Sequence, residues 1–412
     1  MKSKLAHTLL GAVTVGIFIT CCQMNMPPDF LTENIEHADR QYRHLVNNLP
    51  QQNPVLFPHT QNGDEEHRYA QVGHDWTVGF FPGNLWHLYA LTGKEYWKLT
   101  AEKYTQLLEQ VQYDTLQQDI GFIIGCSYLN GYRLTGKKEY VPVVIQAAQT
   151  LATRFRPNLG VFESYPSNRL GRKRGNSLTA KEEGIDRNLC AVVIGSMMDL
   201  EILFEATRLS GDSTYYTMAC SHAKQTLKNH VRENGSIHQV VGYHPSTGKV
   251  EHQGSKQSQD DELSWARGQA WALYGCTICY RYTQDSSYLR LVEKLYNYVF
   301  TNPKLPEDLI PYWNLDALNI SKEPRDVSAA AIIASALYEL YTLTQNEIYS
   351  QTADRLMEAL ASPVYRADIG ENLGFLLMHS VGNKPDGWTI DKPLVYADYY
   401  FLEALKRKSK IE

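Results

Sequence analysis

The stretch YALTGKEYWKLTAEKY, residues 89–104, contains the pattern that predicts the fold. An apolar segment with helical spacing ends at Thr92, Gly93 follows, and a few polar residues precede a second apolar segment. Glycine directly after the last periodic residue is typical of a helix C-terminus, and a residue such as Glu95 is typical of the next N-terminus. The stretch therefore predicts the turn of a helical hairpin.

The same pattern occurs four more times along the chain. The copies are YRLTGKKEYVPVVIQAA from Tyr132, TRLSGDSTYYTMACSHA from Thr207, YRYTQDSSYLRLVEKLY from Tyr280 and YTLTQNEIYSQTADRLM from Tyr341, with Gln in place of Gly in the last two. Strand-like alternation is scarce, and GSIHQVVGYHP (235–245) is the best candidate for a short β-hairpin. The chain thus contains five predicted helical hairpins.

A sixth hairpin completes the predicted architecture. Its helices are PLVYADYYFLEALKRK (393–408) and the helical region after Phe30, from the two ends of the chain. The intervals between the turns are too uneven for a solenoid of identical short repeats. We therefore expect an all-α (α/α)6 barrel, in which the long connections between hairpins gather at one end and form a pocket.

Composition narrows the classes of function. The chain has 412 residues, of which 43% are hydrophobic, so it can bury a sizeable core. Its net charge is −5 and it has no basic run, which argues against a nucleic-acid surface. Tyr, Phe and Trp are plentiful, with 27, 12 and 7 residues. That surplus fits a sugar-binding protein and a large helical core equally well.

The N-terminus is typical of an export signal. Lys2 and Lys4 precede the apolar run LLGAVTVGIFIT (9–20), which is short for a membrane span and ends at Cys21–Cys22. A small residue followed by cysteine resembles a bacterial lipoprotein signal, with simple cleavage as the alternative. We expect a signal peptide at 1–22, a tether at 23–30 and a catalytic barrel at 31–412. The protein would then be an exported periplasmic or outer-membrane lipoprotein that meets a membrane only through its lipid.

The remaining cysteines predict neither a metal site nor a redox site. The CTIC pair, Cys276 and Cys279, lies in an apolar helical run. No second pair and no histidine cluster with zinc spacing accompanies it. We expect buried thiols, and no metal or cofactor.

Two of the long connections contain residues suited to chemistry. In HDWTVGFFPGNLW (74–86), Trp76 and Phe81 lie beside glycines, which fits either ligand contact or a packed corner. In QQDIGFIIGCSY (117–128), Asp119 directly precedes an apolar helix. Its carboxylate could cap that helix, or act as an acid in a pocket that shifts its proton affinity.

A third connection contains SWARGQAW (264–271). Arg267 and Trp271 are four residues apart and share one face if the segment is helical. Arginine can bind a carboxylate through two parallel hydrogen bonds while an indole stacks beside it. The alternative is a salt bridge from Arg267 to Asp260 or Asp261, next to a core tryptophan.

These motifs resemble one family in order and spacing. DWTVGFFPG, DIGF, MMDL, SWARGQAW, PRDVSAAAI and ADYYFLEAL are similar to segments of the unsaturated glucuronyl hydrolases, glycoside hydrolase family 88. The resemblance implies an (α/α)6 barrel that removes 4,5-unsaturated uronic acid from the non-reducing end of lyase-generated glycosaminoglycan or pectin oligosaccharides. An acid protonates C4 of the vinyl ether, water adds at C5, and no metal is needed.

The resemblance also assigns residues to the site. It implies that Asp119 is an active-site acid, that Arg267 and Trp271 bind substrate, and that Gln253 is a pocket glutamine. Gln118 and Gln239 stand where the family has histidines. The complete set of expected site residues is Asp119 and Asp199 as catalytic groups, and Trp76, Phe81, Gln118, His238, Gln239, Gln253, Arg267 and Trp271 as substrate-binding groups.

One departure concerns catalysis directly. The family's general acid/base aspartate falls on Gly195 of IGSMMDLE, and Asp199 lies one helical turn further along. Three hypotheses follow. The protein is an altered hydrolase that uses Asp119 with help from Asp199 or His238, or a hydrolase of a different uronic-acid glycan. Alternatively, it is a catalytically altered or inactive member that binds glycans as a lipoprotein.

Overall fold

The computed structural model describes residues 29–50, 55–63, 66–73, 75–165, 186, 188–258 and 260–411. The expected signal peptide, and the tether up to residue 28, lie outside the described residues. The first helix begins at Phe30, after the N-cap Asp29.

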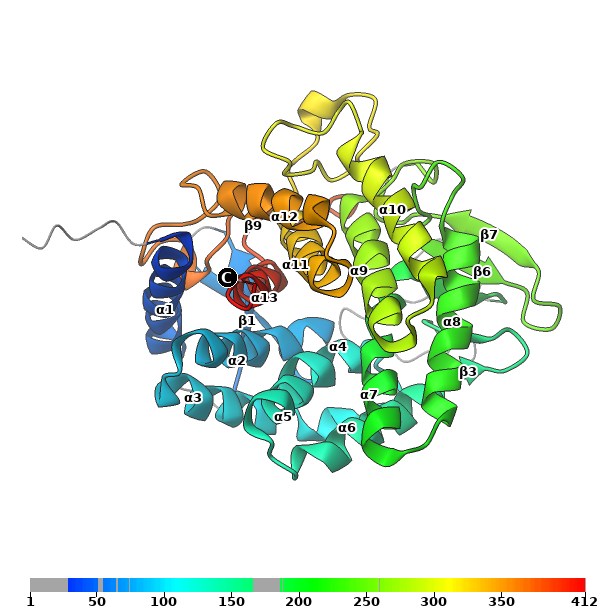
Figure 1. The fold of residues 1–412 in the computed structure, drawn as a ribbon, viewed down its shortest axis with the longest axis horizontal. Helices are drawn as coiled ribbons and strands as arrows, with labels where there is room; N and C mark the ends of the chain where they lie inside the picture. Colours follow the sequence, from blue (N-terminus) through cyan, green and yellow to red (C-terminus); the bar gives the residue numbers. More distant parts are fainter. Residues whose placement is uncertain are drawn as a thin grey trace, which may run out of the picture.

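An inner ring of helices, surrounded by an outer layer, confirms the predicted (α/α)6 barrel (Figure 1). Successive inner helices pack against one another, and α13 packs against α2, which closes the ring. The inner positions are α2 (Phe80–Thr92), α4 (Ile120–Ile124) with α5 (Asn130–Thr135), α7 (Leu200–Ser210), α9 (Ala266–Thr283), α11 (Val327–Thr344) and α13 (Val395–Lys408). The outer helices are α1 (Phe30–Asn48), α3 (Glu95–Gln106), α6 (Tyr140–Ala152), α8 (Thr214–His230), α10 (Ser286–Phe300) and α12 (Glu347–Leu360).

The repeated turn has the same geometry in all five predicted hairpins. The residue after each inner helix is left-handed, with φ of 67° at Gly93 and 56° at Gln284. The preceding hydroxyl closes the helix: Thr92 Oγ1 donates to the Leu88 carbonyl at 2.6 Å and accepts from the Lys94 amide at 3.3 Å. Where glutamine replaces glycine, its side-chain amide donates to carbonyls of the last turn. Those hydrogen bonds help glutamine adopt the left-handed conformation, which glycine usually adopts more readily.

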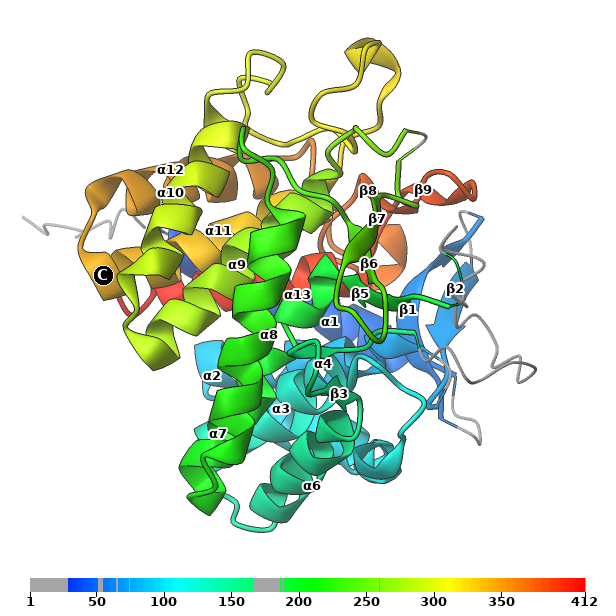
Figure 2. The same cartoon turned by 90° about the vertical axis from the view of Figure 1, so that its right-hand side faces the viewer.

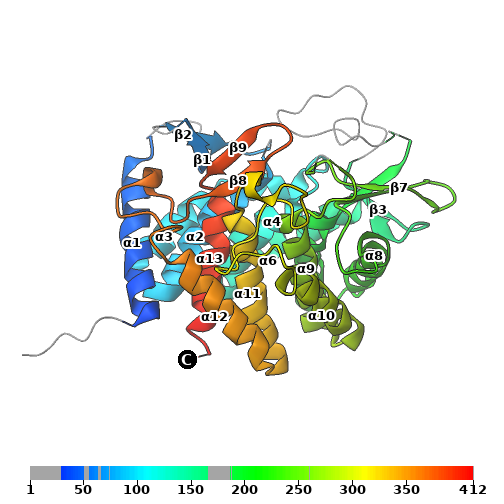
Figure 3. The same cartoon turned by 90° about the horizontal axis from the view of Figure 1, so that it is seen from above.

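Short strands lie at the end of the barrel opposite to these turns (Figures 2 and 3). The predicted hairpin at 235–245 is instead the middle of a three-stranded antiparallel sheet. That sheet contains β5 (Cys190–Val193), β6 (Val240–Tyr243) and β7 (Val250–Gly254). The two-stranded pairs are β1 (Phe57–Asn62) with β2 (Glu66–Ala70), β3 (Phe155–Arg156) with β4 (Val161–Phe162), and β8 (Ser380–Asn383) with β9 (Trp388–Lys392).

Short 3-10 and π turns join several elements to the inner helices. They are η1 (Trp76–Gly79), η2 (Glu109–Tyr113), the π-turn η3 (Gly125–Leu129), η4 (Ile194–Met197), η5 (Ile320–Lys322) and η6 (Asn372–Gly374). Among the described residues, α11 alone is long and apolar enough to span a membrane, and most of it is buried in the ring. The predicted burial of the Cys276 and Cys279 thiols is confirmed.

A chain of ion pairs joins five of the inner positions, and we call it the ionic belt. Glu201 of α7 pairs with Arg133 of α5 at 2.8 Å and with Arg281 of α9 at 2.5 Å. Glu339 of α11 continues the belt to Arg281 at 2.8 Å and to Arg407 of α13 at 2.6 Å. Five of the six inner positions are thus connected through charged side chains. The belt adjoins the buried rings of Tyr274, Tyr399 and Tyr400, because Arg407 donates to the Tyr274 hydroxyl and Tyr400 packs against both other rings.

Candidate active site

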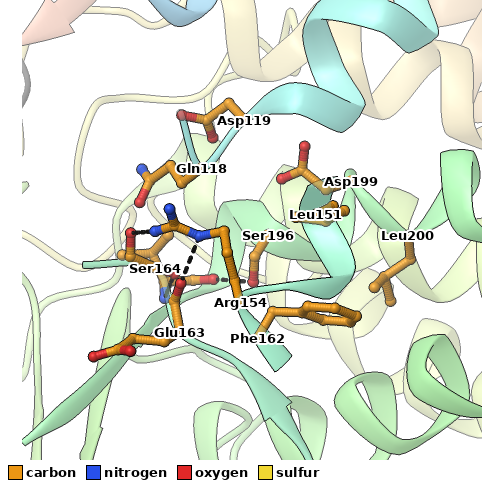
Figure 4. Close-up of a pocket in the computed structure, with 11 residues that line it drawn as sticks. Gln118, Asp119, Leu151, Arg154, Phe162, Glu163, Ser164, Ser196, Asp199 and Leu200 are labelled. Atoms are coloured by element: carbon orange, nitrogen blue, oxygen red, sulfur yellow. Dashed lines mark hydrogen bonds between the residues drawn. The ribbon is translucent and has the colours of Figure 1, made fainter. Parts of the chain in front are cut away.

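Asp119 and Asp199 line one pocket at the strand end of the ring (Figure 4). Asp119 directly precedes α4, and Asp199 directly precedes α7, so adjacent inner positions bring the two carboxyl groups together. The rest of the lining is Gln118, Leu151, Arg154, Phe162, Glu163, Ser164, Val193, Ser196 and Leu200. The free volume is about 10 Å³, space for about one water molecule. A sugar ring would therefore lie at the mouth of the pocket.

The carboxyl of Asp119 does not cap the helix that follows it. Its side chain makes no cap hydrogen bond. Instead, Asp199 Oδ1 accepts from the Phe122 amide at 3.0 Å and so occupies the N-terminus of α4. The approach requires glycine at position 121, because a Cβ there would lie 2.4 Å from Asp199 Cα. The capping alternative for Asp119 is thus wrong, and its carboxyl is left for other contacts.

Burial makes both carboxyls hard to ionise. It raises the pKa of Asp119 to about 7, although Gln118 and the charge of Arg154 oppose the rise. Burial also raises the pKa of Asp199, which is 2% exposed, and the neighbouring charge of Asp119 adds to the increase. Two close carboxyls titrate as a pair. We therefore expect the pair to hold a proton near neutral pH.

An aromatic cluster includes the ring of Phe122, whose backbone amide binds Asp199. Half-buried Trp76 lies 5.3 Å from both Phe122 and Tyr396, and Phe122 lies 5.3 Å from Trp271, all between ring centroids. Trp76 and Trp271 therefore belong to one aromatic cluster that adjoins the pair through Phe122. Neither of them lines the pocket, and Trp271 is only 3% exposed.

Phe81 does not belong to this cluster. Its side chain is 0% exposed, and its ring packs edge-on against Tyr104 at 4.8 Å. These positions lie on α2 and α3, so Phe81 fills the core between an inner and an outer helix. The prediction that Phe81 contacts substrate is wrong, because a residue next to a loop glycine can equally be the first core residue of a helix.

Arg267 has partners within the protein. It forms an ion pair with Asp326 at 3.0 Å and donates to the carbonyls of Val381 at 2.6 Å and Gly382 at 2.7 Å. The structure thus shows the salt bridge that was the alternative reading, with Asp326 in place of Asp260 or Asp261. It does not present a preformed carboxylate clamp, because the guanidinium already holds the starts of α9 and α11 against β8.

This geometry predicts the outcome of Arg267→Lys. A single ammonium cannot reproduce the bonds to Asp326 and to two carbonyls, so we expect a loss of about 1–3 kcal/mol in the free energy of unfolding. Urea denaturation measures that loss. If KM rises more than tenfold while stability is unchanged, the clamp role would be supported instead.

Of the eight expected substrate contacts, only Gln118 lines the pocket, and three that remain to be placed are His238, Gln239 and Gln253. His238 packs against Arg232, with ring nitrogens 3.2 and 3.1 Å from its Nε and Nη2. Gln239 is buried, and its Oε1 accepts from the Gln257 amide at 3.0 Å. Gln253 is exposed and donates to the Asn229 carbonyl at 2.7 Å. Their predicted roles in substrate binding therefore have no support from the pocket.

The chain resembles known proteins over most of its length. Residues 52–362 match the sequence profile described as Glycosyl Hydrolase Family 88. The chain belongs to this family. It is 39% identical over 356 residues to an unsaturated glucuronyl hydrolase of Formosa agariphila, which covers 86% of this chain and 85% of the relative. The protein is thus a glycoside hydrolase of family 88.

Further relatives extend the similarity. The chain is 29% identical over 343 residues to an unsaturated chondroitin disaccharide hydrolase of Streptococcus pneumoniae, covering 81% of each protein. A crystal structure of an unsaturated glucuronyl hydrolase specific for heparin superposes with a TM-score of 0.84 at 36% identity. The match covers 93% of this chain and 98% of that one. Both the sequence and the fold therefore agree with family 88 over most of the chain.

Gly195 is the position where the family resemblance places a general acid/base aspartate. A Cβ built on Gly195 would meet only Trp271 Cδ1, at 3.9 Å, so the position has room for a side chain. Gly195 is partly exposed, and Asp199 follows on the same segment. The second aspartate that lines the pocket is Asp199, four residues after Gly195.

The pocket also contains residues that the sequence analysis missed. Arg154, Glu163, Ser164 and Ser196 all line it. Arg154 lies in LATRFRPN, and nothing in that stretch distinguishes it from Arg156. Ser196 adjoins Gly195 but carries no motif of its own. Only the tertiary structure, in which α6 packs against α4 and α7 and β4 packs against α8, identifies these residues.

Proposed function

We propose that this family 88 protein removes 4,5-unsaturated uronic acid from the non-reducing end of oligosaccharides produced by polysaccharide lyases. The observation that carries the proposal is the pair of carboxyls in one pocket, with Asp119 half-buried and Asp199 buried. Trp76 and Trp271 adjoin the pair through Phe122. The named relatives add support, because they act on unsaturated glucuronyl and chondroitin compounds. The substrate class is an unsaturated glycosaminoglycan or pectin oligosaccharide.

The chemistry matches a carboxyl pair that holds one proton. The protonated carboxyl gives its proton to C4 of the vinyl ether, and water bonds to C5 while the ionised carboxyl accepts a proton from it. The pair thus ends with the same number of protons as it had at the start. The hemiketal at C5 opens and releases a keto sugar acid and the shortened glycan. One water molecule is consumed.

The two carboxyls differ in their surroundings, and we assign both of them to the same proton-transfer reaction. Asp119 is the more exposed and faces the mouth, so it is our main acid. Asp199 is anchored by the Phe122 amide and supplies the second carboxyl that the family resemblance places at Gly195. This is a non-standard acid/base arrangement, and it is built one helical turn away from the expected position.

The test uses unsaturated disaccharides prepared with glycosaminoglycan and pectate lyases. Loss of the ultraviolet absorbance of the C4=C5 double bond reports the reaction, and the released keto acid is identified by mass spectrometry. Activity on at least one disaccharide supports the proposal. Tight binding without loss of absorbance would favour the alternative, a glycan-binding family member that the glycine at position 195 has deprived of catalysis.

We also propose that the protein is exported and lipid-anchored at Cys21 or Cys22. Support comes from Lys2, Lys4 and the short apolar run before the two cysteines. We expect labelled palmitate to be incorporated by the wild type and lost on Cys21→Ser or Cys22→Ser, whichever residue carries the lipid. Incorporation by neither the wild type nor the variants would leave simple signal cleavage as the explanation.

A further inference from the structure

Arg154 connects the two segments that carry the carboxyl pair. It is 5% exposed and lies in the turn between α6 and β3. Its Nη1 donates to the Thr115 carbonyl at 3.0 Å, its Nε to the Glu163 carbonyl at 3.0 Å, and its Nη2 to the Ser164 carbonyl at 2.5 Å. The guanidinium is thus fixed to backbone on two sides, next to Gln118 (Figure 4).

The Thr115 side of this bridge leads to Asp119. The turn between them is tight, because Asp114 accepts from the Leu116 amide through Oδ1 at 2.9 Å and from the Gln117 amide through its carbonyl at 3.1 Å. Gln117 Oε1 then accepts from the Asp119 amide at 3.1 Å. A displacement at Thr115 would therefore move the backbone of Asp119.

The Ser164 side leads to Asp199. The Ser164 amide donates to the Ala191 carbonyl at 2.8 Å, and Ser164 Oγ accepts from the Val193 amide at 3.1 Å. Val193 ends β5, η4 follows, and the Asp199 amide donates to the Ser196 carbonyl at 3.2 Å. Arg154 is therefore the side chain through which both carboxyl segments share a set of hydrogen bonds.

We infer that Arg154 is a positioning residue for catalysis, which holds Asp119 and Asp199 at a fixed separation and balances the negative charge of the pair. The inference rests on the proposed function. A pair with one proton has a charge of −1, which the guanidinium offsets. Glu163, a further carboxylate of the lining, pairs with Arg156, and the charge of Asp75 opposes that of Arg154 at Asp119. Burial raises the pKa of both carboxyls, and the charge of Arg154 acts in the opposite direction on each.

Two variants separate the charge of Arg154 from its geometry. Arg154→Met keeps the length of the side chain but removes the charge and all donors. Arg154→Lys keeps the charge but replaces three directed donors by one ammonium group. Arg208→Met is the matched control, because Arg208 is an exposed arginine paired with Glu205 on α7, outside the pocket lining.

The first readout is the titration of the two carboxyls. It is measured by NMR on protein labelled with ¹³C at aspartate, and the signals are assigned with Asp119→Asn and Asp199→Asn. In Arg154→Met we expect the titration of the pair to move up by about one pH unit or more. In Arg154→Lys and Arg208→Met it should stay near that of the wild type. This measurement needs no substrate, so it tests the inference even if the protein acts on none of the disaccharides.

The second readout is kinetic. We expect kcat to fall about 10- to 100-fold in both Arg154 variants, with KM close to the wild-type value, because misplaced carboxyls impair the reaction more than binding. Unchanged titration and unchanged kcat in a folded Arg154→Met protein would overturn the inference. A rise confined to KM would also overturn it, because it would make Arg154 a substrate contact. If Arg154→Met does not fold, Arg154→Lys provides the kinetic test. A lower kcat then supports the inference, and an unchanged kcat overturns it.

Discussion

Asp119→Asn should reduce kcat on unsaturated disaccharides by about 10²- to 10⁴-fold, the usual contribution of a general acid or base. Asparagine has nearly the same shape as aspartate but cannot deliver a proton, and its neighbours Gln118 and Asp199 remain in place. Loss of the C4=C5 absorbance under substrate saturation measures the effect. Asp212→Asn is the control, because Asp212 is an exposed carboxylate that caps the start of α8 away from the pocket.

The same variant should change how stability depends on pH. The pKa of Asp119 rises from 3.8 to about 7 on burial, so the folded state holds this proton more tightly than the unfolded chain. Stability should therefore fall as the pH rises from about 4 to about 7, and Asp119→Asn should remove that part of the fall. We expect the variant to be more stable than the wild type at about pH 8 and similar to it at about pH 4. Equal pH dependence of urea unfolding in both proteins would contradict the assigned proton.

Asp199→Asn should cause a comparable loss of activity, and Gly195→Asp should restore part of it in the same chain. The double variant moves the carboxyl back by one turn to the position that the family resemblance predicts. Space is available there, because a Cβ at position 195 would meet only Trp271 Cδ1 at 3.9 Å. We expect the double variant to recover at least about tenfold over Asp199→Asn, within the range of acid–base catalysis.

The matched control for this exchange is Gly195→Asn in the Asp199→Asn background. It adds a side chain of the same size without an acid, so any recovery must come from the carboxyl. If the aspartate and asparagine versions are equally inactive while both are folded, the second carboxyl of this enzyme has not moved by one turn. If Asp199→Asn alone keeps full activity, Asp199 has no part in proton transfer.

The barrel could be predicted from sequence because its signals are local. Each turn is fixed by a hydroxyl at the helix end and a left-handed residue after it, as at Thr92 and Gly93. These contacts span four residues or fewer, so they can be seen in the sequence as a repeated phrase. The pairing of the first and last helices followed because a closed ring leaves no other partner for either.

The site was predicted less well because its contacts are between distant segments. Arg267 pairs with Asp326, which is 59 residues away, although two nearer aspartates were available. The start of α4 is capped by Asp199, which is 77 residues away, although Asp119 was adjacent. Local rules favoured the near partner in both cases. Family resemblance supplied Asp119, but it gave no indication of Arg154.

The ionic belt bears on which part of a glycan this enzyme can cut. Charged side chains pair across five inner positions and buried tyrosines pack beside them, so the interior of the ring is filled and a polysaccharide cannot thread through the barrel. A chain that enters from the strand side meets a dead end at the carboxyl pair. A blind pocket accepts a terminus and rejects an internal stretch, so the enzyme should remove only the terminal unsaturated residue and leave the interior of the glycan intact.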